Sequence, residues 1–200
     1  MKRLFISLLF FLPVGGFAAD TNVYSNSALG INVTKPTDWH FMSGNQFLEN
    51  VRDTKLKDEE LHKLLEKSPV PLMVLTKYAE PLDDLNPSLK IRVLPLGNFP
   101  ADNPTNIGND IIRFSKDLNS KVEVEPTETT VADHKASYLK TSYDIVLADN
   151  RVFHACSEVW VVPIKKRDFY FMFIADTRAD EKNGTRTEIK GILDSVKIDK

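Results

Sequence analysis

Hydrophobic and polar positions follow a two-residue period over much of the second half of the chain. Four segments alternate in this way or are almost continuously apolar: residues 121–130, 136–147, 152–162 and 169–175. Short polar stretches such as Ala148-Asp149-Asn150 separate them. This arrangement is typical of strands joined by tight turns. The sequence therefore predicts a meander of four antiparallel strands.

Shorter segments before the meander predict further strands. Residues 29–33 alternate apolar with small or polar side chains, and Pro36 interrupts ladder pairing before the pattern resumes at Trp39. We interpret this stretch as a hairpin or a bent pair of strands. Residues 72–78 are nearly continuously apolar, as in a strand covered on both faces, and residues 89–93 alternate. These two segments predict two further strands, which the polar residues 80–87 join.

Three segments place apolar side chains at helical spacing. Residues 53–67 carry leucines among charged residues, and Ser68-Pro69 ends that pattern. In the second segment Asn103 is the expected cap, and the apolar positions are Ile107, Ile111, Phe114 and Leu118. The third begins with a capping-box pattern, Thr185-Arg186-Thr187-Glu188, and precedes a short closing strand. Strands followed by packed helices predict the α+β class.

The first nineteen residues have the organisation of a cleavable secretory signal peptide. Lys2 and Arg3 precede an apolar run over residues 4–14, and small residues follow before Asp20. We predict cleavage after Ala18, with cleavage after the next residue as the alternative. An uncleaved anchor is disfavoured because the run is shorter than the ~20 apolar residues that span a bilayer. We therefore expect residues 1–18 to be a signal peptide, residues 19–200 to form one domain, and the product to be periplasmic or secreted.

Composition limits the class of partner. The formal net charge is -2, and cleavage would remove two basic residues, so a nucleic-acid partner is disfavoured. Lys165-Lys166-Arg167 falls between two strand segments, where we predict a solvated turn, with an anionic contact patch as the alternative. Cys156 is the single cysteine, so no internal disulfide forms, and no cysteine follows the leader to carry a lipid anchor. We expect a monomer that is not integral to the membrane.

Four stretches resemble a known family: Leu29-Gly30-Ile31 running to Asp38-Trp39, Asn86-Pro87-Ser88, Ala136-Ser137-Tyr138, and Ile192-Leu193-Asp194-Ser195-Val196. Together with the order of elements, they resemble PsbP-like proteins of the Mog1/PsbP fold over nearly the whole mature chain. The resemblance implies an antiparallel sheet of about six strands sandwiched between helices. It also implies a non-catalytic binding or assembly module, as in bacterial envelope members of the family. No catalytic residues or cofactor come with it.

His154, Cys156, Glu158 and Trp160 are the sharpest candidates for a binding face, because alternate residues of one strand share a side of the sheet. The first three are competent zinc ligands, but alternate residues lie ~7 Å apart, too far for three to hold one ion. A nucleophilic role for Cys156 lacks an oriented base in the sequence. We favour the structural interpretation, in which the thiol packs under a helix and the imidazole and carboxylate lie toward the rim.

No sequence motif indicates a particular enzymatic reaction. The chain has no nucleophile elbow, no phosphate-binding glycine loop and no dinucleotide fingerprint. We therefore predict that it is not an enzyme, that it needs no cofactor, and that it binds a protein of the cell envelope through a sheet edge or a groove between helix and sheet. The alternative is a periplasmic carrier of a small apolar ligand or a metal ion.

Overall fold

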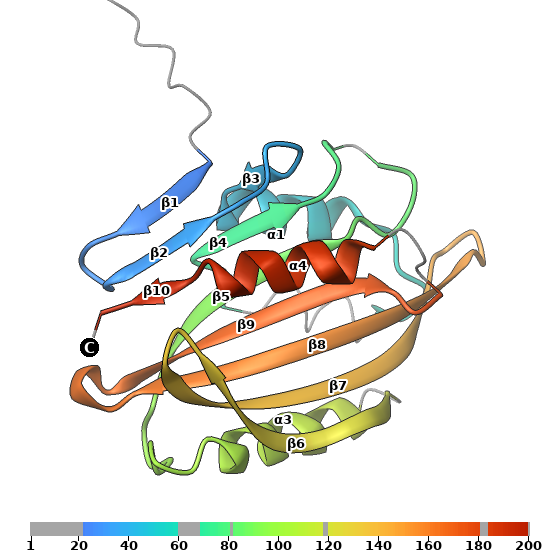
Figure 1. The fold of residues 1–200 in the computed structure, drawn as a ribbon. Helices are drawn as coiled ribbons and strands as arrows, with labels where there is room; N and C mark the ends of the chain where they lie inside the picture. The colour runs from blue at the N-terminus through green and yellow to red at the C-terminus, as the bar shows by residue number, and fades with distance from the viewer. Residues whose placement is uncertain (1–21, 60–68, 81, 118–119, 181–183, 200) are drawn as a thin grey trace, which may run out of the picture.

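The computed structural model describes residues 22–59, 69–80, 82–117, 120–180 and 184–199. In this part of the chain two antiparallel sheets pack with three helices (Figure 1). The signal peptide predicted at residues 1–18 lies outside the described residues. So do residues 60–67 of the helix predicted at 53–67, and residues 54–58 of that segment are not helical. None of the described helices combines the length and apolarity needed to cross a bilayer.

The larger sheet has seven strands, and all their pairings are antiparallel. In spatial order they are β3 (His40–Met42), β4 (Met73–Thr76), β5 (Ser88–Pro95), β9 (Phe169–Arg178), β8 (Val152–Ile164), β7 (His134–Val146) and β6 (Lys121–Val131). The predicted four-strand meander is confirmed as β6 to β9. Every residue of β4 is buried, as its continuous apolar pattern predicts.

Strand β9 shows why the sheet is covered on both sides. Phe171 and Phe173 belong to one hydrophobic core, whereas Met172 and Ile174 belong to a second. Successive side chains of a strand point to opposite faces, so an apolar run requires packing on each face. The sheet is therefore the central layer of the fold.

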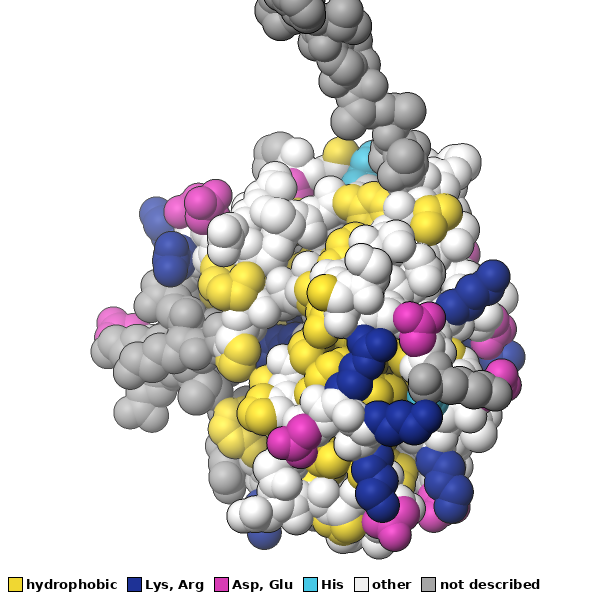
Figure 2. All heavy atoms as spheres, turned by 90° about the vertical axis from the view of Figure 1, so that its left-hand side faces the viewer, with side chains coloured by type: hydrophobic (Ala, Val, Ile, Leu, Met, Phe, Trp, Pro, Cys, Tyr) yellow, Lys and Arg dark blue, Asp and Glu magenta, His cyan; other side chains and the backbone are white. Residues whose placement is uncertain are grey.

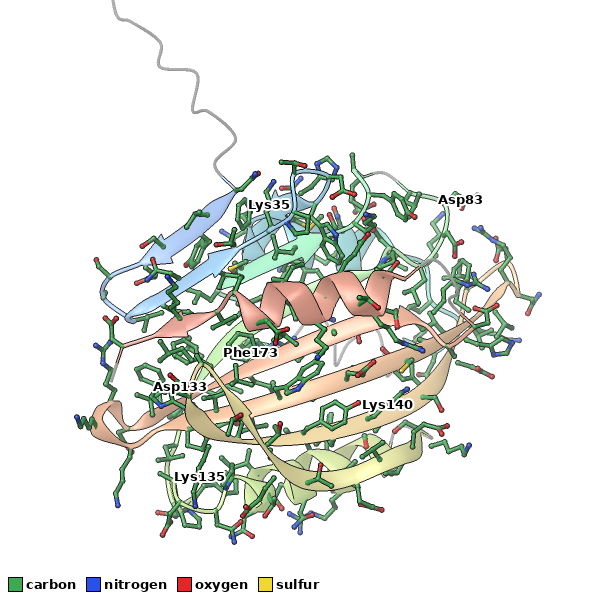
Figure 3. The ribbon with its side chains drawn as sticks, viewed as in Figure 1. Lys35, Asp83, Asp133, Lys135, Lys140 and Phe173 are labelled. Carbon is green, nitrogen blue, oxygen red and sulfur yellow. The ribbon has the colours of Figure 1, made fainter. Side chains whose placement is uncertain are left out.

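Helices cover the two faces, which confirms the predicted α+β sandwich. Helix α4 (Thr185–Asp194) buries Ile189 and Ile192 in the core that contains Phe173, and Figure 3 shows Phe173 beside this helix. Helix α3 (Thr105–Asp117) buries Ile107 and Ile112 against the opposite face. We refer to the two sides of the sheet as the α4 face and the α3 face.

The contact side of α3 differs from the predicted stripe. Phe114 was expected to face the sheet but is 51% exposed, and Ile112 is buried in its place. The reason is a close approach at Gly108, where an added Cβ would lie 2.8 Å from Pro126 and from Ser137. The helix turns its glycine toward β6 and β7, which carries Phe114 out to the surface.

A smaller sheet on the α4 face joins the two ends of the described chain. It consists of β1 (Val23–Asn26), β2 (Ile31–Thr34) and β10 (Lys197–Ile198), with β2 in the middle. The backbone N–H of Asp199 donates to the carbonyl of Gly30 at 2.9 Å. The expected strand pair over residues 29–41 is wrong, because β2 and β3 belong to different sheets.

Two helix starts also differ from expectation. Helix α1 (Gly44–Asp53) was not predicted, and it begins at Ser43, whose hydroxyl accepts the backbone N–H of Gln46 at 3.2 Å. The capping box predicted at Thr185 does not form, because the residue at the cap position is Gly184. Glu188 instead accepts a hydrogen bond from the indole N–H of Trp39 at 3.0 Å.

Candidate binding groove

A groove of about 810 Å³ lies on the α4 face, between α4 and the strands β6 to β8. Helix α4 packs over β9, and the strands beyond it leave one side of the helix open. Figure 3 shows Lys140 on the sheet beneath this opening and Asp133 at the β6–β7 turn. The groove therefore has a sheet floor, a helix wall and a hairpin at one end.

Two aromatic rings form part of the floor. Tyr138 and Trp160 face each other across β7 and β8, with ring centroids 5.2 Å apart and a tilt of 40°. Both are half-buried and line the groove. Large rings supply much contact area with few rotatable bonds. The floor can therefore hold an apolar group with little reordering.

A polar network beside the rings fixes three side chains. The Tyr138 hydroxyl donates to Glu158 Oε2 at 2.8 Å, and Arg186 Nε from α4 lies 3.5 Å from Glu158 Oε1. Arg186 also donates to the carbonyl of Arg178 at 3.1 Å. Burial and the bond to the carboxylate raise the pKa of Tyr138 above its ordinary value, so the phenol stays neutral. The network links the helix wall to the floor.

The charges lining the groove balance. Lys140, Arg186 and Lys190 are its cations, and its carboxylates are Asp133, Glu158 and Asp194. Lys140 and Lys190 make no ion pair with any residue in the described part of the chain. The ammonium groups of Lys140 and Lys190 are therefore available to an anionic group of a ligand bound on the aromatic floor.

His154, Cys156, Glu158 and Trp160, the four candidates from the sequence, lie on one face of β8, but their environments differ. Glu158 and Trp160 line the groove. Cys156 is 2% exposed, and burial raises the pKa of its thiol, so little thiolate forms near neutral pH. His154 is exposed farther along β8, and its Nδ1 lies 2.7 Å from Asp144 Oδ1. The four side chains lie on one side of β8, and two of them, Glu158 and Trp160, line the groove.

Among the described residues, no three His, Cys, Asp or Glu side chains are grouped to hold a metal ion. His154 lies on the exposed part of β8 and Cys156 is buried, so these two candidates and Glu158 do not converge on one point.

Sequence reasoning missed Tyr138, Lys140, Arg186 and Lys190. Alternation within residues 136–147 places Tyr138 and Lys140 on one side of a strand, which was a usable signal. Their position opposite Trp160 and Glu158 depends on the register between β7 and β8. Register follows from turn geometry and from packing, which alternation alone does not specify.

Comparison with known proteins defines the fold. No family model and no curated protein matches the chain. The chain is similar to the solution structure of cyanobacterial PsbP (CyanoP) from Synechocystis, with a TM-score of 0.52 and 14% identity over 94% of this chain and 99% of that one. The chain has a PsbP-like fold. At 14% identity the similarity concerns the fold alone. We therefore transfer no functional residue from CyanoP to the groove.

Two further solved structures are similar to the PsbP-like chain. One is a protein from Bacteroides thetaiotaomicron, with a TM-score of 0.49 and 9% identity over 91% of this chain and 50% of that one. The other is LpqN of Mycobacterium tuberculosis, described as involved in cell envelope biogenesis, with a TM-score of 0.49 and 13% identity over 85% of this chain and 83% of that one. The PsbP-like fold rests on the comparison with CyanoP.

Proposed function

We propose that this chain is an exported, non-catalytic binding module of the bacterial cell envelope and that it holds a segment of a partner protein in the groove. The observation that carries the proposal is the composition of the groove. Tyr138, Trp160 and Arg186 line it together, and Tyr, Trp and Arg are the residue types that contribute most to binding at protein interfaces.

The state of these side chains supports a protein partner. Arg186 is held by Glu158 and by a backbone carbonyl, so the helix wall is ordered before a partner arrives. Tyr138 and Trp160 are in contact with each other. Ordering side chains on binding costs about 0.5–1.5 kcal/mol each, so an already ordered surface binds more tightly.

The reactive groups nearby support a non-catalytic role. A nucleophilic mechanism needs a thiolate or hydroxyl within hydrogen-bond reach of a base. Cys156 is buried with a raised pKa, and His154 is hydrogen-bonded to Asp144 on the exposed end of the face. The Tyr138 hydroxyl does donate to the Glu158 carboxylate in the groove, but burial and that carboxylate raise the pKa of Tyr138, which keeps the phenol neutral and weakly nucleophilic.

Site-specific cross-linking in the native cells tests this proposal. A photoreactive residue replaces Thr187, which is exposed and lines the groove, in the full chain with its own leader. The matched control places the same residue at Asn109, exposed on α3 on the other side of the sheet. We expect a defined envelope protein to cross-link at position 187 only, and Trp160→Ala to abolish the product.

Two results would contradict the proposal. Equal cross-linking at both positions, or a product unaffected by Trp160→Ala, would remove the groove as the binding site. A co-purified apolar molecule or stoichiometric metal, with no cross-linked protein, would replace the adaptor role by that of a carrier.

A further inference from the structure

The turn between β8 and β9 concentrates basic side chains at one end of the large sheet. Lys165, Lys166 and Arg167 form a single 3-10 turn and are all exposed. Lys135 is exposed at the same end of β7, because Ser137 pairs with Val161 near the end of β8. We call these four residues the basic tip. Figure 2 faces this end and shows Lys and Arg side chains beside apolar ones, with some Asp and Glu side chains among them.

The positive charge of the basic tip is not neutralised by ion pairs. Arg167 donates to the backbone carbonyl of Ala28 at 3.1 Å, which orders the guanidinium without cancelling its charge. None of the four cations pairs with a carboxylate among the residues that the structure describes. Asp133 and Asp168 lie in the same two turns, and Asp199 lies beside Gly30 in the β1–β2 turn that Arg167 contacts, so four cations have three carboxylates near them. The tip therefore keeps an excess of positive charge.

The opposite end of the sheet carries no such excess of positive charge. Strand β8 has 13 residues and spans ~40 Å between the two ends. At the far end Asp83, Asp84, Asp149 and Asp180 pair with Arg151 and Arg178. Asp144, Lys55 and Lys57 are exposed there too, so five carboxylates lie among four cations. The chain carries a formal net charge of -2, yet its charge is polarised along the strands. An anionic surface would therefore attract the basic tip more strongly than the far end.

The shape of the basic tip indicates that it binds a broad anionic surface rather than a small anion. A projecting turn cannot enclose a small anion, and three of its four cations are lysines, which act as mobile point charges rather than as bidentate forks. We propose that the basic tip docks this chain on the surface of an anionic phospholipid bilayer, with the long strands pointing away from the membrane. This contact is peripheral, and it does not depend on the groove or its partner.

Vesicle sedimentation tests the docking. The chain is expressed with its own leader, purified from the periplasmic fraction, and mixed with vesicles of phosphatidylcholine alone or with phosphatidylglycerol. We expect binding only to the anionic vesicles and its loss at high salt, because screening shortens the Debye length from ~10 Å at 0.1 M to ~3 Å at 1 M. The double variant Lys165→Gln/Lys166→Gln should partition about thirtyfold less.

The control removes the same charge at the far end of the sheet. Lys55 and Lys57 are exposed, and the latter donates to Asn150 beside the β7–β8 turn, so Lys55→Gln/Lys57→Gln should bind as the unchanged chain does. Thermal unfolding checks that all variants fold. Equal loss in both double variants, no binding to either vesicle, or equal binding to neutral vesicles would overturn the proposal. Release by soluble glycerol 3-phosphate would also overturn it, in favour of a site for free phosphate.

Discussion

Protonation of the Tyr143 hydroxyl, near the centre of the large sheet, is linked to the stability of the fold. The Tyr143 hydroxyl donates to Asp176 Oδ1 at 3.3 Å, and Lys90 forms an ion pair with the same carboxyl group. Burial and the neighbouring carboxylate raise the pKa of Tyr143 well above its ordinary value of 10.0. The folded chain therefore keeps this phenol protonated at a pH where the unfolded chain releases the proton.

The sign of the linkage follows from that difference. Stability from Tyr143 is fully present below pH 10, and it falls as the pH rises above that value, because only the unfolded state gains from ionisation there. We expect the free energy of unfolding, measured in urea across this range, to decline less steeply in Tyr143→Phe. The same change at Tyr78, which is 42% exposed, serves as the control. Identical slopes for Tyr143→Phe and the unchanged chain would contradict the assignment.

For single residues, the sequence predicted the face of a strand but not the partners on that face. Alternation correctly placed His154, Cys156, Glu158 and Trp160 on one face, because the period of a strand is fixed by its backbone. The partners on that face come from other elements. Arg186 reaches Glu158 only because α4 packs over β9, and no local pattern in either segment specifies that packing.

Two glycines within helices differ in how closely the helix packs around them, and this difference predicts opposite effects on stability. Gly108 and Gly191 both lie within helices, where alanine is favoured by about 1 kcal/mol. An added Cβ meets nothing within 4 Å at Gly191, but it lies 2.8 Å from Pro126 and Ser137 at Gly108. We expect Gly191→Ala to stabilise the chain by about 0.5–1 kcal/mol. Gly108→Ala should destabilise it by about 1–3 kcal/mol, since α3 must move away from the sheet.

Urea denaturation of the two variants gives both values. The matched pair separates helix propensity from packing, because the chemical change is identical in each helix. A stabilising Gly108→Ala would mean that the contact between α3 and the β6–β7 pair is looser than the structure shows.

Elements with strong local patterns were the ones that sequence predicted well. The meander β6 to β9 and helix α3 follow from periodicity and turn residues. Helix α1 was missed because few apolar residues repeat along it, and of these Leu48 is buried. The capping box did not form because Gly184 occupies the cap position. Glu188 instead binds Trp39, 149 positions away, and Lys77, and no local pattern indicates these partners.

At the scale of the whole molecule, stability depends on closing the small sheet. Ile198 of β10 is 8% exposed and packs in the same core as Trp39 and Phe173. We expect Ile198→Ala to lower the free energy of unfolding by about 2–5 kcal/mol, and Lys197→Ala, exposed on the same strand, to change it by less than about 0.5 kcal/mol. Tryptophan fluorescence in urea measures both. An unchanged midpoint for Ile198→Ala would separate β10 from the cooperative unit.

The place of β10 beside β2 also determines when folding can finish. The strand pairing of Ile198 with Ile31 joins residues from opposite ends of the chain. A ribosome or a translocation channel releases the N-terminal end first, so β2 emerges long before its partner. Contacts so distant in sequence form slowly and only after both segments are free. In a chain exported as proposed, the small sheet and the core around Ile198 could therefore close only after β10 has left the channel.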